Sequence, residues 1–280
     1  MEHLYRFQNR LVYRSELKGT VDKGRKQRVV LAVGAHPDDV EFLMAGTLSL
    51  LHKRGWDVCI ATICTGDMGS MELRKEEISS KRFQEAKSSA RILRAPYVCL
   101  GESDLHIVFD NPTRSKAIEL VRKIDPAIVI THSPEDYMFD HQLTADLMWD
   151  ACFSASIPNY ATDQANPAKP TKRTPYLYYS DAVGGLDRFG RRVRPDFYVD
   201  IGSTMNIKEK MLTRHESQRR WLREQHGIDQ YILQMKKWSK ERGSEIGRKY
   251  AEAFRQHKGH PFPESNILVS ILGRGYIEVG

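Results

Sequence analysis

Cysteine is scarce in this chain of 280 residues, which has four: Cys59, Cys64, Cys99 and Cys152. No two of them form a C-x-x-C pair, and the first three lie inside apolar runs. Thiolate metal sites usually contain C-x-x-C pairs, and cysteines inside apolar runs are usually buried free thiols, so the pattern argues against a thiolate site and against disulfides. We expect all four to be small buried residues in a reducing compartment.

Long apolar runs are missing as well. No stretch approaches the ~20 consecutive apolar residues that a membrane helix requires. Residues 1–17 carry Arg and Glu throughout and lack the apolar segment of a signal peptide. We therefore expect a cytoplasmic protein with no membrane partner. The length suits one α/β domain over residues 28–280, preceded by an N-terminal extension over residues 1–27.

The formal net charge is +7, yet the sequence carries no signature of a nucleic-acid-binding protein. The positive residues are densest over 208–258, where Glu and Asp are interleaved with them. Mixed charges of this kind are typical of solvated helix faces. With no zinc-finger spacing and no aromatic RNA-binding motif, we expect no nucleic-acid partner. The alternative, binding through these basic helices, predicts an affinity that falls steeply with salt.

Short apolar runs alternate with helical periodicity through the first half of the chain. The apolar runs are rich in β-branched residues and lie at 28–35, 57–64, 97–100 and 126–131. Apolar residues recur at helical spacing over 40–53, 73–93, 115–124 and 143–153. Continuous apolar strands are typical of parallel sheets that are buried on both faces. The alternation predicts a Rossmann-like, doubly wound α/β fold, with a mostly parallel sheet and helices on both faces.

The second half of the chain is less regular. Residues 157–175 are rich in proline and lack periodicity, which predicts a long loop. Because such loops are usually functional or mobile, we expect it at the rim of the site or against a neighbouring subunit. The remaining expected elements are strands at 176–180 and 197–201 and two long helices, about 207–225 and 230–256, within a C-terminal helical region over about 205–258.

The first predicted strand leads into Ala35-His36-Pro37-Asp38-Asp39. A dinucleotide-binding fold has G-x-G-x-x-G at this place, because a pyrophosphate must approach the backbone closely. An imidazole and two carboxylates stand here instead. The motif therefore argues against NAD or nucleotide binding and predicts a site with different chemistry.

Two segments supply candidate metal ligands. His36 and Asp39 lie three residues apart at the turn into a helix, which brings them to one side. The fourth strand ends next to His132, and His141 follows at the start of a helix. In the strand order 3-2-1-4-5, strands one and four are neighbours, and ligands bind at their carboxyl ends. Either His141 or His132 can therefore complete a site of three protein ligands, as in catalytic zinc centres, although iron(II) also accepts such a set.

Asp38 is a spare carboxylate beside this predicted site. It can take a proton from a water molecule whose pKa a zinc ion lowers towards ~7. The hydroxide then attacks a carbonyl carbon, and Asp38 passes its proton to the leaving nitrogen. The residues thus predict a metal-dependent hydrolase in which Asp38 is the general base.

The sequence resembles the LmbE-like, or PIG-L, family of zinc-dependent N-acetylglucosaminyl deacetylases over about residues 28–273. The stronger motifs are Ala35-His36-Pro37-Asp38-Asp39, continuing to Glu41-Phe42 and Gly46-Thr47-Leu48, and the later Asp140-His141, which is similar to the end of the family motif H-P-D-H. The weaker matches are Thr65-Gly66-Asp67, Arg82 with Glu85-Ala86, Leu100-Gly101 with Asp104, and His215-x-Ser217-Gln218.

The resemblance implies that His36, Asp39 and His141 bind one zinc ion and that Asp38 is the general base. Family members act on N-acetylglucosaminyl lipids, thiol-sugar conjugates, chitin fragments and antibiotic precursors, and many are hexamers or smaller oligomers. We therefore expect a homo-oligomer that removes the acetyl group from the nitrogen of a small N-acetylated amino sugar or conjugate.

Further residues receive roles from the same resemblance. Arg82 and Asp104 are expected to hold sugar hydroxyls. Where the family often has a histidine that assists the oxyanion, this sequence has Met138, which cannot donate a hydrogen bond. Tyr137 is the expected replacement donor. The alternatives are His132 and the absence of such a donor.

Three other functions stay open. One is a zinc amidase acting on another acetamide or a thiol-sugar conjugate. Another is a non-catalytic metal- or ligand-binding module, which predicts a decayed set of site residues, whereas Asp38 is intact. The third is the nucleic-acid binding considered above. His215 and Gln218 are expected to tie the C-terminal helices to the domain.

Overall fold

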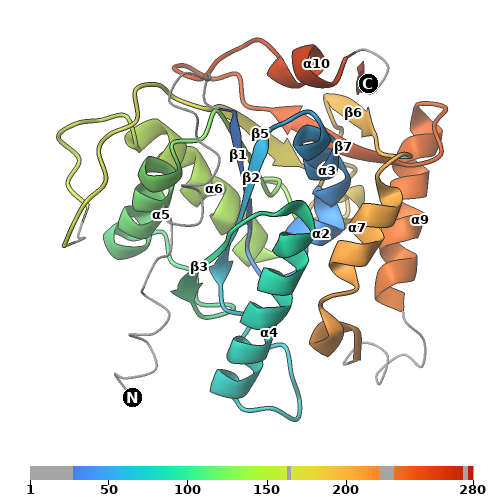
Figure 1. Ribbon diagram of the computed structural model, residues 1–280, viewed down its shortest axis with the longest axis horizontal. Helices are drawn as coiled ribbons and strands as arrows, with labels where there is room; N and C mark the ends of the chain where they lie inside the picture. The colour runs from blue at the N-terminus through green and yellow to red at the C-terminus, as the bar shows by residue number, and fades with distance from the viewer. Residues whose placement is uncertain (1–27, 163–164, 221–229, 274–276, 280) are drawn as a thin grey trace.

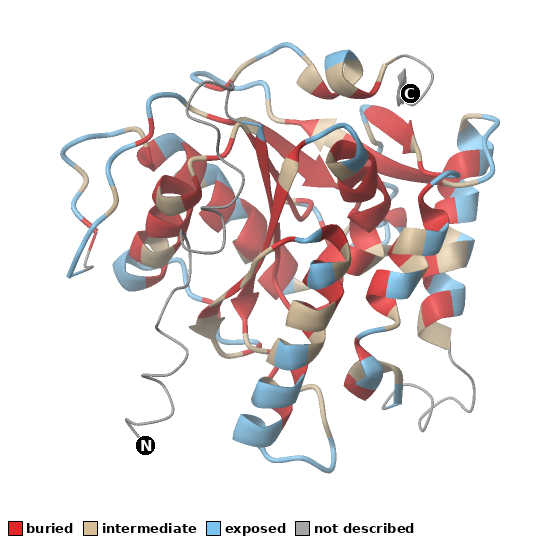
Figure 2. Ribbon diagram, viewed as in Figure 1, coloured by how far each residue is buried: buried red, intermediate tan, exposed pale blue. Residues whose placement is uncertain are grey.

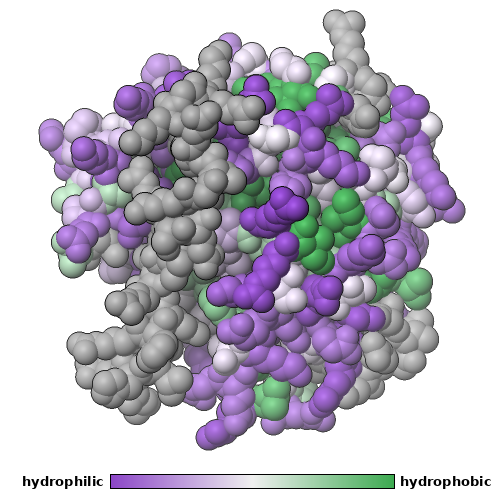
Figure 3. All heavy atoms as spheres, viewed as in Figure 1, coloured by the Kyte–Doolittle hydropathy of each residue, from purple (hydrophilic) through white to green (hydrophobic). Residues whose placement is uncertain are grey.

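The computed structural model describes residues 28–162, 165–220, 230–273 and 277–279. The expected N-terminal extension, residues 1–27, lies outside these described residues, so the division at residue 28 stays a prediction. Among the described residues, no helix is long and apolar enough to cross a bilayer. On the face shown in Figure 3, hydrophilic residues predominate, and apolar residues gather in small patches.

The described strands form one mixed sheet. They are β1 (Val29–Gly34), β2 (Asp57–Cys64), β3 (Tyr97–Glu102), β4 (Ile128–Thr131), β5 (Tyr176–Ser180), β6 (Phe197–Asp200), β7 (Ala251–Gln256) and β8 (Ile277–Val279). Their order is β3-β2-β1-β4-β5-β7-β6-β8. The pairs from β3 through β5 are parallel, and the pairs that involve β7 or β8 are antiparallel. The predicted doubly wound α/β fold and its 3-2-1-4-5 strand order are confirmed.

Helices cover both faces of the sheet (Figure 1). They are α2 (Asp39–Leu43), α3 (Ala45–Lys53), α4 (Lys75–Ala90), α5 (Asn111–Ile124), α6 (Phe139–Ser154), α7 (Met205–Leu212), α9 (Gln230–Glu245) and α10 (Ile267–Leu272), with single 3-10 turns η1 (Arg91–Leu93) and η2 (Val183–Gly185). Helices α5 and α6 pack on one face, and α3, α4, α7, α9 and α10 share the core of the other.

Strand β1 shows why the sheet is buried on both sides. Val30 and Ala32 point into one apolar core, whereas Leu31 and Val33 point into the other. All four are fully buried, as the central red strands of Figure 2 show. A continuous apolar run is therefore read correctly as an interior parallel strand.

The expected helix over 230–256 is wrong in its second part. Helix α9 ends at Glu245, the chain turns at Gly247 with a φ of 67°, and residues 251–256 form β7. This strand lies between β5 and β6 and pairs with both. Its side chains are buried by these neighbours, so tertiary pairing overrides the local helical pattern. The helix expected over 207–225 is also interrupted, because α7 ends at Leu212 and helical structure resumes at 216–220.

The proline-rich loop, residues 157–175, does not lie at the rim of the site. It enters β5, which is parallel to β4, and therefore lies at the amino ends of the strands. Arg122 of α5 holds the loop by donating hydrogen bonds to the carbonyls of Ala155, Ile157 and Tyr160. The rim expectation is wrong, because α6 carries the chain across the sheet before the loop begins. A contact with a neighbouring subunit stays a prediction.

Candidate metal and catalytic site

The predicted ligands meet at the carboxyl ends of β1 and β4. The two strands pair in parallel, so the turn after β1 and the start of α6 lie beside each other. His36 and Asp39 come from the turn into α2, and His141 lies in the first turn of α6. One ligand atom from each of these three residues lies within 4.8 Å of the other two, so the group could hold a metal ion.

In both His36 and His141, one ring nitrogen faces Asp39 and the other faces a second aspartate. His36 Nε2 lies 2.9 Å from Asp140 Oδ2, and His141 Nδ1 lies 3.0 Å from Asp136 Oδ1. The opposite nitrogens face Asp39, with His36 Nδ1 at 3.4 Å and His141 Nε2 at 3.5 Å from its carboxylate. Carboxylates commonly orient metal-binding imidazoles in this way. The donor set therefore fits a divalent cation between the two rings and Asp39.

His132 lies directly behind this group. Its ring is fully buried and stacks on the ring of His141, with centroids 4.0 Å apart and an interplanar angle of 13°. Its Nε2 accepts a hydrogen bond from the Ala35 backbone at 2.9 Å and lies 3.0 Å from Asp39 Oδ2. Burial and the charge of His141 lower the pKa of His132. The residue is thus a neutral imidazole that packs against Asp39 and His141.

The two adjacent aspartates have opposite electrostatic environments. Burial raises the pKa of Asp38, although the charge of Arg82 opposes the shift. Burial also acts to raise the pKa of Asp39, but His141 and His132 outweigh it and hold that pKa well below its usual range. Asp38 makes no side-chain hydrogen bond to the α2 backbone, so it is not a conventional helix cap.

The ring pKa values reflect the surrounding carboxylates. Burial lowers the pKa of His36, but the hydrogen bonds to Asp140 and Asp39 outweigh it and raise the pKa to about 10. For His141, burial is likewise outweighed by Asp39 and Asp136, which raise its pKa to about 9. So much negative charge around two imidazoles is an environment that favours a bound cation.

A pocket of about 450 Å³ is lined by His36, Asp38, Asp39 and His141. Tyr137 and Met138 lie on its wall beside α6. Tyr137 is 59% exposed, and its ring meets that of His141 edge-on at 5.7 Å. Met138 immediately precedes α6.

Arg82 and Asp104 also line the pocket, but each is already engaged by the protein. Arg82 Nη2 donates to the Pro37 carbonyl at 2.6 Å and lies 3.3 Å from Asp38 Oδ2. The Asp104 carboxylate accepts hydrogen bonds from the backbones of Gly66 and Met68. Both residues therefore lie at the site, and both also hold backbone segments beside it through these hydrogen bonds.

Several pocket residues have no counterpart among the residues predicted for the site. Val183 follows β5, Gln218 follows α7, and Tyr231 and Gln234 come from α9. They lie far along the chain from the motif, so no local pattern connects them with it. The sequence analysis also did not identify Asp136 as the partner of His141. Its position five residues before that histidine could have indicated the contact.

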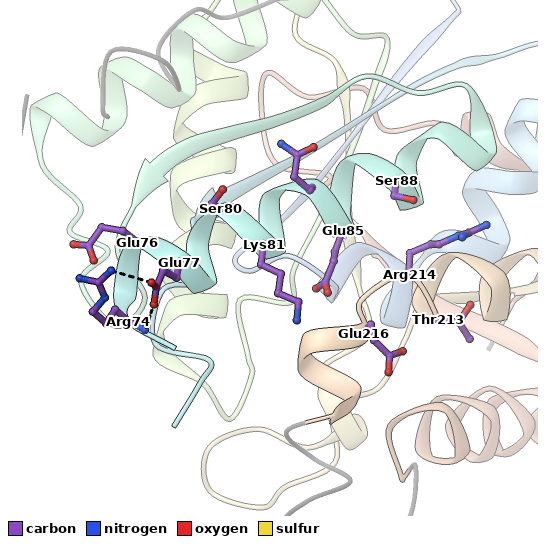
Figure 4. Close-up of a pocket in the computed structure, with 11 residues that line it drawn as sticks. Arg74, Glu76, Glu77, Ser80, Lys81, Glu85, Ser88, Thr213, Arg214 and Glu216 are labelled. Atoms are coloured by element: carbon purple, nitrogen blue, oxygen red, sulfur yellow. Dashed lines mark hydrogen bonds and ion pairs between the residues drawn. The ribbon is translucent and has the colours of Figure 1, made fainter. Parts of the chain in front are cut away.

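A larger groove lies between α4 and the segment after α7 (Figure 4). Its described walls carry charges of both signs, with Arg74 paired to Glu77 and Glu85 accepting hydrogen bonds from Ser217. No histidine is among its lining residues. The groove is open, and its lining residues include no converging set of metal ligands such as the one in the smaller pocket.

Comparisons with known proteins place these features in a family. The PIG-L family model, described as GlcNAc-PI de-N-acetylase, matches residues 31–152. Diacetylchitobiose deacetylase of Thermococcus kodakarensis is 28% identical over 68% of this chain and 69% of its own. 4-Oxalmesaconate hydratase of Pseudomonas putida is 25% identical over 65% of this chain and 70% of its own.

The fold is similar to that of a solved N,N'-diacetylchitobiose deacetylase from Pyrococcus horikoshii. The TM-score is 0.71 at 24% identity, over 91% of this chain and 95% of that one. This likeness extends over both sides of the sheet, including the C-terminal part beyond the matched motif region. The matched region of 31–152 contains His36, Asp38, Asp39 and His141. Residues 31–152 of this chain therefore form a domain that matches the PIG-L, or LmbE-like, family.

Proposed function

We propose that this protein is a metal-dependent hydrolase that removes the acetyl group from the nitrogen of an N-acetylated amino sugar or sugar conjugate. The observation that carries the proposal is the convergence of His36, Asp39 and His141 beside a separate buried carboxylate, Asp38, in one pocket. The deacetylase names of two relatives, from Thermococcus kodakarensis and Pyrococcus horikoshii, support the same reaction class.

One divalent ion would be held by His36, Asp39 and His141. Two imidazoles and a carboxylate suit Zn²⁺, and Fe²⁺ is the alternative. When bound, such an ion supplies Lewis acidity, which polarises a carbonyl and lowers the pKa of a water molecule.

Asp38 would carry the protons of the reaction. Its carboxylate accepts a proton as water attacks the acetyl carbon, and it returns the proton to the nitrogen as the C–N bond breaks. The products are acetate and a free amine. Burial and the charges of Asp39 and Asp136 raise the pKa of Tyr137 to about 12. Its phenol therefore stays protonated at neutral pH and can donate a hydrogen bond to the developing oxyanion, which Met138 cannot do.

A second candidate reaction is the hydration of an unsaturated carboxylate, because one relative is named as such a hydratase. The charges of the pocket favour deacetylation instead. Among its described lining residues, Arg82 is the one guanidinium, and it is paired with Asp38. Asp38, Asp39 and Asp104 place three carboxylates around the same space. Apart from the proposed metal and its ligands, the described lining offers an anionic substrate no unpaired guanidinium or ammonium group, and a neutral acetamido sugar needs none.

The decisive experiment combines metal analysis with product detection. Purified protein is assayed for bound divalent metal and then incubated with N-acetylglucosamine, N,N'-diacetylchitobiose and an N-acetylated thiol-sugar conjugate. We expect stoichiometric metal and the release of acetate and primary amine in equal amounts from at least one sugar. If the protein instead hydrates an unsaturated dicarboxylate and releases no amine from any acetamide, then it is a hydratase and the proposed deacetylase function is wrong.

A further inference from the structure

The backbone of Asp38 is in an unusual conformation. Its φ of 109° and ψ of −23° lie in a region that residues other than glycine rarely adopt. Such conformations persist where the surrounding structure fixes them, and they concentrate at functional sites. Something outside the turn must therefore hold Asp38 in place.

Arg82 of α4 is the first such support. Its Nη2 donates to the carbonyl of Pro37 at 2.6 Å and lies 3.3 Å from Oδ2 of Asp38. A single nitrogen thus holds both the peptide that precedes the strained residue and the carboxylate of that residue. The Arg82 side chain is only 5% exposed, so water competes little for either contact.

The loop after β2 is shaped around this guanidinium. A Cβ atom at Gly66 would lie 2.6 Å from Cδ and Nε of Arg82, and one at Gly69 would lie 2.5 Å from Nη1. Any side chain at either position would displace the guanidinium. The two glycines therefore fix where Arg82 can lie, and through it where Asp38 lies.

Tyr231 of α9 is the second support. It lines the pocket beside Asp38, and its ring stacks on Phe42 of α2 with centroids 5.3 Å apart and an interplanar angle of 22°. Burial raises the pKa of the phenol well above its usual range, and the negative charge of Asp38 adds to the shift. A helix outside the region 31–152 that matches the family model thus places a phenol in the pocket beside Asp38.

We propose that Arg82 is a positioning residue that holds Asp38, with Tyr231 as a second support of the same carboxylate. The inference rests on the proposed function, in which Asp38 moves the proton. It predicts that loss of either support lowers kcat and leaves KM nearly unchanged, because the substrate is bound but the base is misplaced.

The test uses Arg82→Lys, which keeps the charge but loses the planar fork, and Tyr231→Phe, which keeps the stacked ring. Displacement of a catalytic group by about 1 Å can cost roughly 100-fold, so we expect Arg82→Lys to lower kcat by about 10- to 100-fold and Tyr231→Phe by less. KM should stay within about twofold for both variants. Metal content should not change.

Two matched controls separate this role from a loss of stability. Arg122→Lys removes another buried guanidinium that donates to backbone carbonyls, far from the pocket. Tyr198→Phe removes a phenol that donates to the carboxylate of Glu245 at 2.6 Å. Both controls should lower the unfolding temperature without changing kcat.

A double-mutant cycle with Asp38→Asn completes the test. If Arg82 acts through Asp38, then Arg82→Lys should cause little further loss in the Asp38→Asn background. An equal loss in both backgrounds, or a raised KM with unchanged kcat, would overturn the positioning role. If Arg82→Lys does not fold, the same cycle with Tyr231→Phe decides the question. Full activity of Asp38→Asn alone would instead overturn the proposed function, so the two failures are distinguishable.

Discussion

Asp38 and Asp39 are neighbours in one turn, yet they face different partners. Asp39 faces two imidazoles, which hold its pKa well below the usual range, whereas burial raises the pKa of Asp38. Carboxylates whose pKa values are driven apart in this way divide naturally into a permanently charged group and a proton carrier. This division supports Asp39 as the metal ligand and Asp38 as the base.

We expect Asp38→Asn and Asp39→Asn to have separable effects. Asp38→Asn should keep the metal and lower kcat by about two to four orders of magnitude, the usual scale for a general acid–base group. Asp39→Asn should lower metal content itself, and His141→Ala should do the same. Metal analysis and kcat on one acetylated sugar provide the measurements. If Asp38→Asn loses the metal and Asp39→Asn keeps it, the two roles are reversed.

Tyr137 and Met138 allow a test of the oxyanion donor. Removal of one such donor costs roughly 3 kcal/mol in transition-state stabilisation, so Tyr137→Phe should lower kcat by about 10²- to 10³-fold. Met138→His should preserve or raise kcat, because an imidazole can donate where a thioether cannot. Phe139→Leu, a change at an exposed neighbour that is not among the pocket residues, is the control. An unchanged kcat in Tyr137→Phe would assign the donor to another group.

At the scale of elements, a buried ion pair joins three segments behind the site. Glu252 of β7 accepts hydrogen bonds from the backbones of Gly46 and Thr47, at 2.8 and 2.7 Å, at the start of α3. Lys208 of α7 donates to the same carboxylate at 2.6 Å. A carboxylate at a helix N-terminus satisfies free N–H groups and interacts favourably with the helix dipole. The strand that the sequence pattern misassigned therefore supports the helix that follows the motif.

We expect Glu252→Gln to destabilise the fold strongly. The substitution leaves the charge of Lys208 buried and unpaired, and breaking a buried pair in this way typically costs about 3–5 kcal/mol. Denaturant unfolding monitored by circular dichroism gives the free energy of unfolding. Glu241→Gln, which removes one partner of an exposed pair with Lys237, should barely change it. Equal small effects of both substitutions would show that the buried pair contributes little.

At the scale of the whole molecule, the site lies between β1 and β4. At this point the strand order changes direction, because β2 and β3 lie on one side of β1 and β4 and β5 lie on the other. Helices after β1 and after β4 leave the sheet on opposite faces, which opens the pocket between them. Later segments then close it, with Val183 from the turn after β5 and Tyr231 from α9. A ligand bound there contacts elements from most of the fold and should stabilise all of them together.

Metal removal is expected to lower global stability as well as activity. A ligand at 100 times its Kd stabilises the folded state by about 2.7 kcal/mol. Chelation should therefore lower Tm and abolish amine release, and added Zn²⁺ should restore both. In Asp39→Asn, Zn²⁺ should have much less effect on Tm, as thermal unfolding with and without the ion will show. An equal rise in Tm for both proteins would place the metal elsewhere.

The expected homo-oligomer stays a prediction that a light-scattering mass will test.

The sequence by itself determined the parallel half of the sheet and the convergence of the candidate ligands at its edge. Both follow from local information, because a doubly buried strand must be continuously apolar, and a strand-to-helix turn displays its polar residues at one edge of the sheet. The expected strand order makes strands one and four neighbours, and this alone predicts that His36, Asp39 and His141 lie close together.

The tertiary structure alone decided the rest. Residues 251–256 became a strand because β5 and β6 flank them, and the loop over 157–175 lies at the far edge because α6 crosses the sheet first. The contacts of Arg82 and Tyr231 with Asp38 join segments 44 and 193 positions apart in the numbering. Such contacts leave no periodic trace in the sequence, since they depend on how whole elements pack and not on the residues next to them.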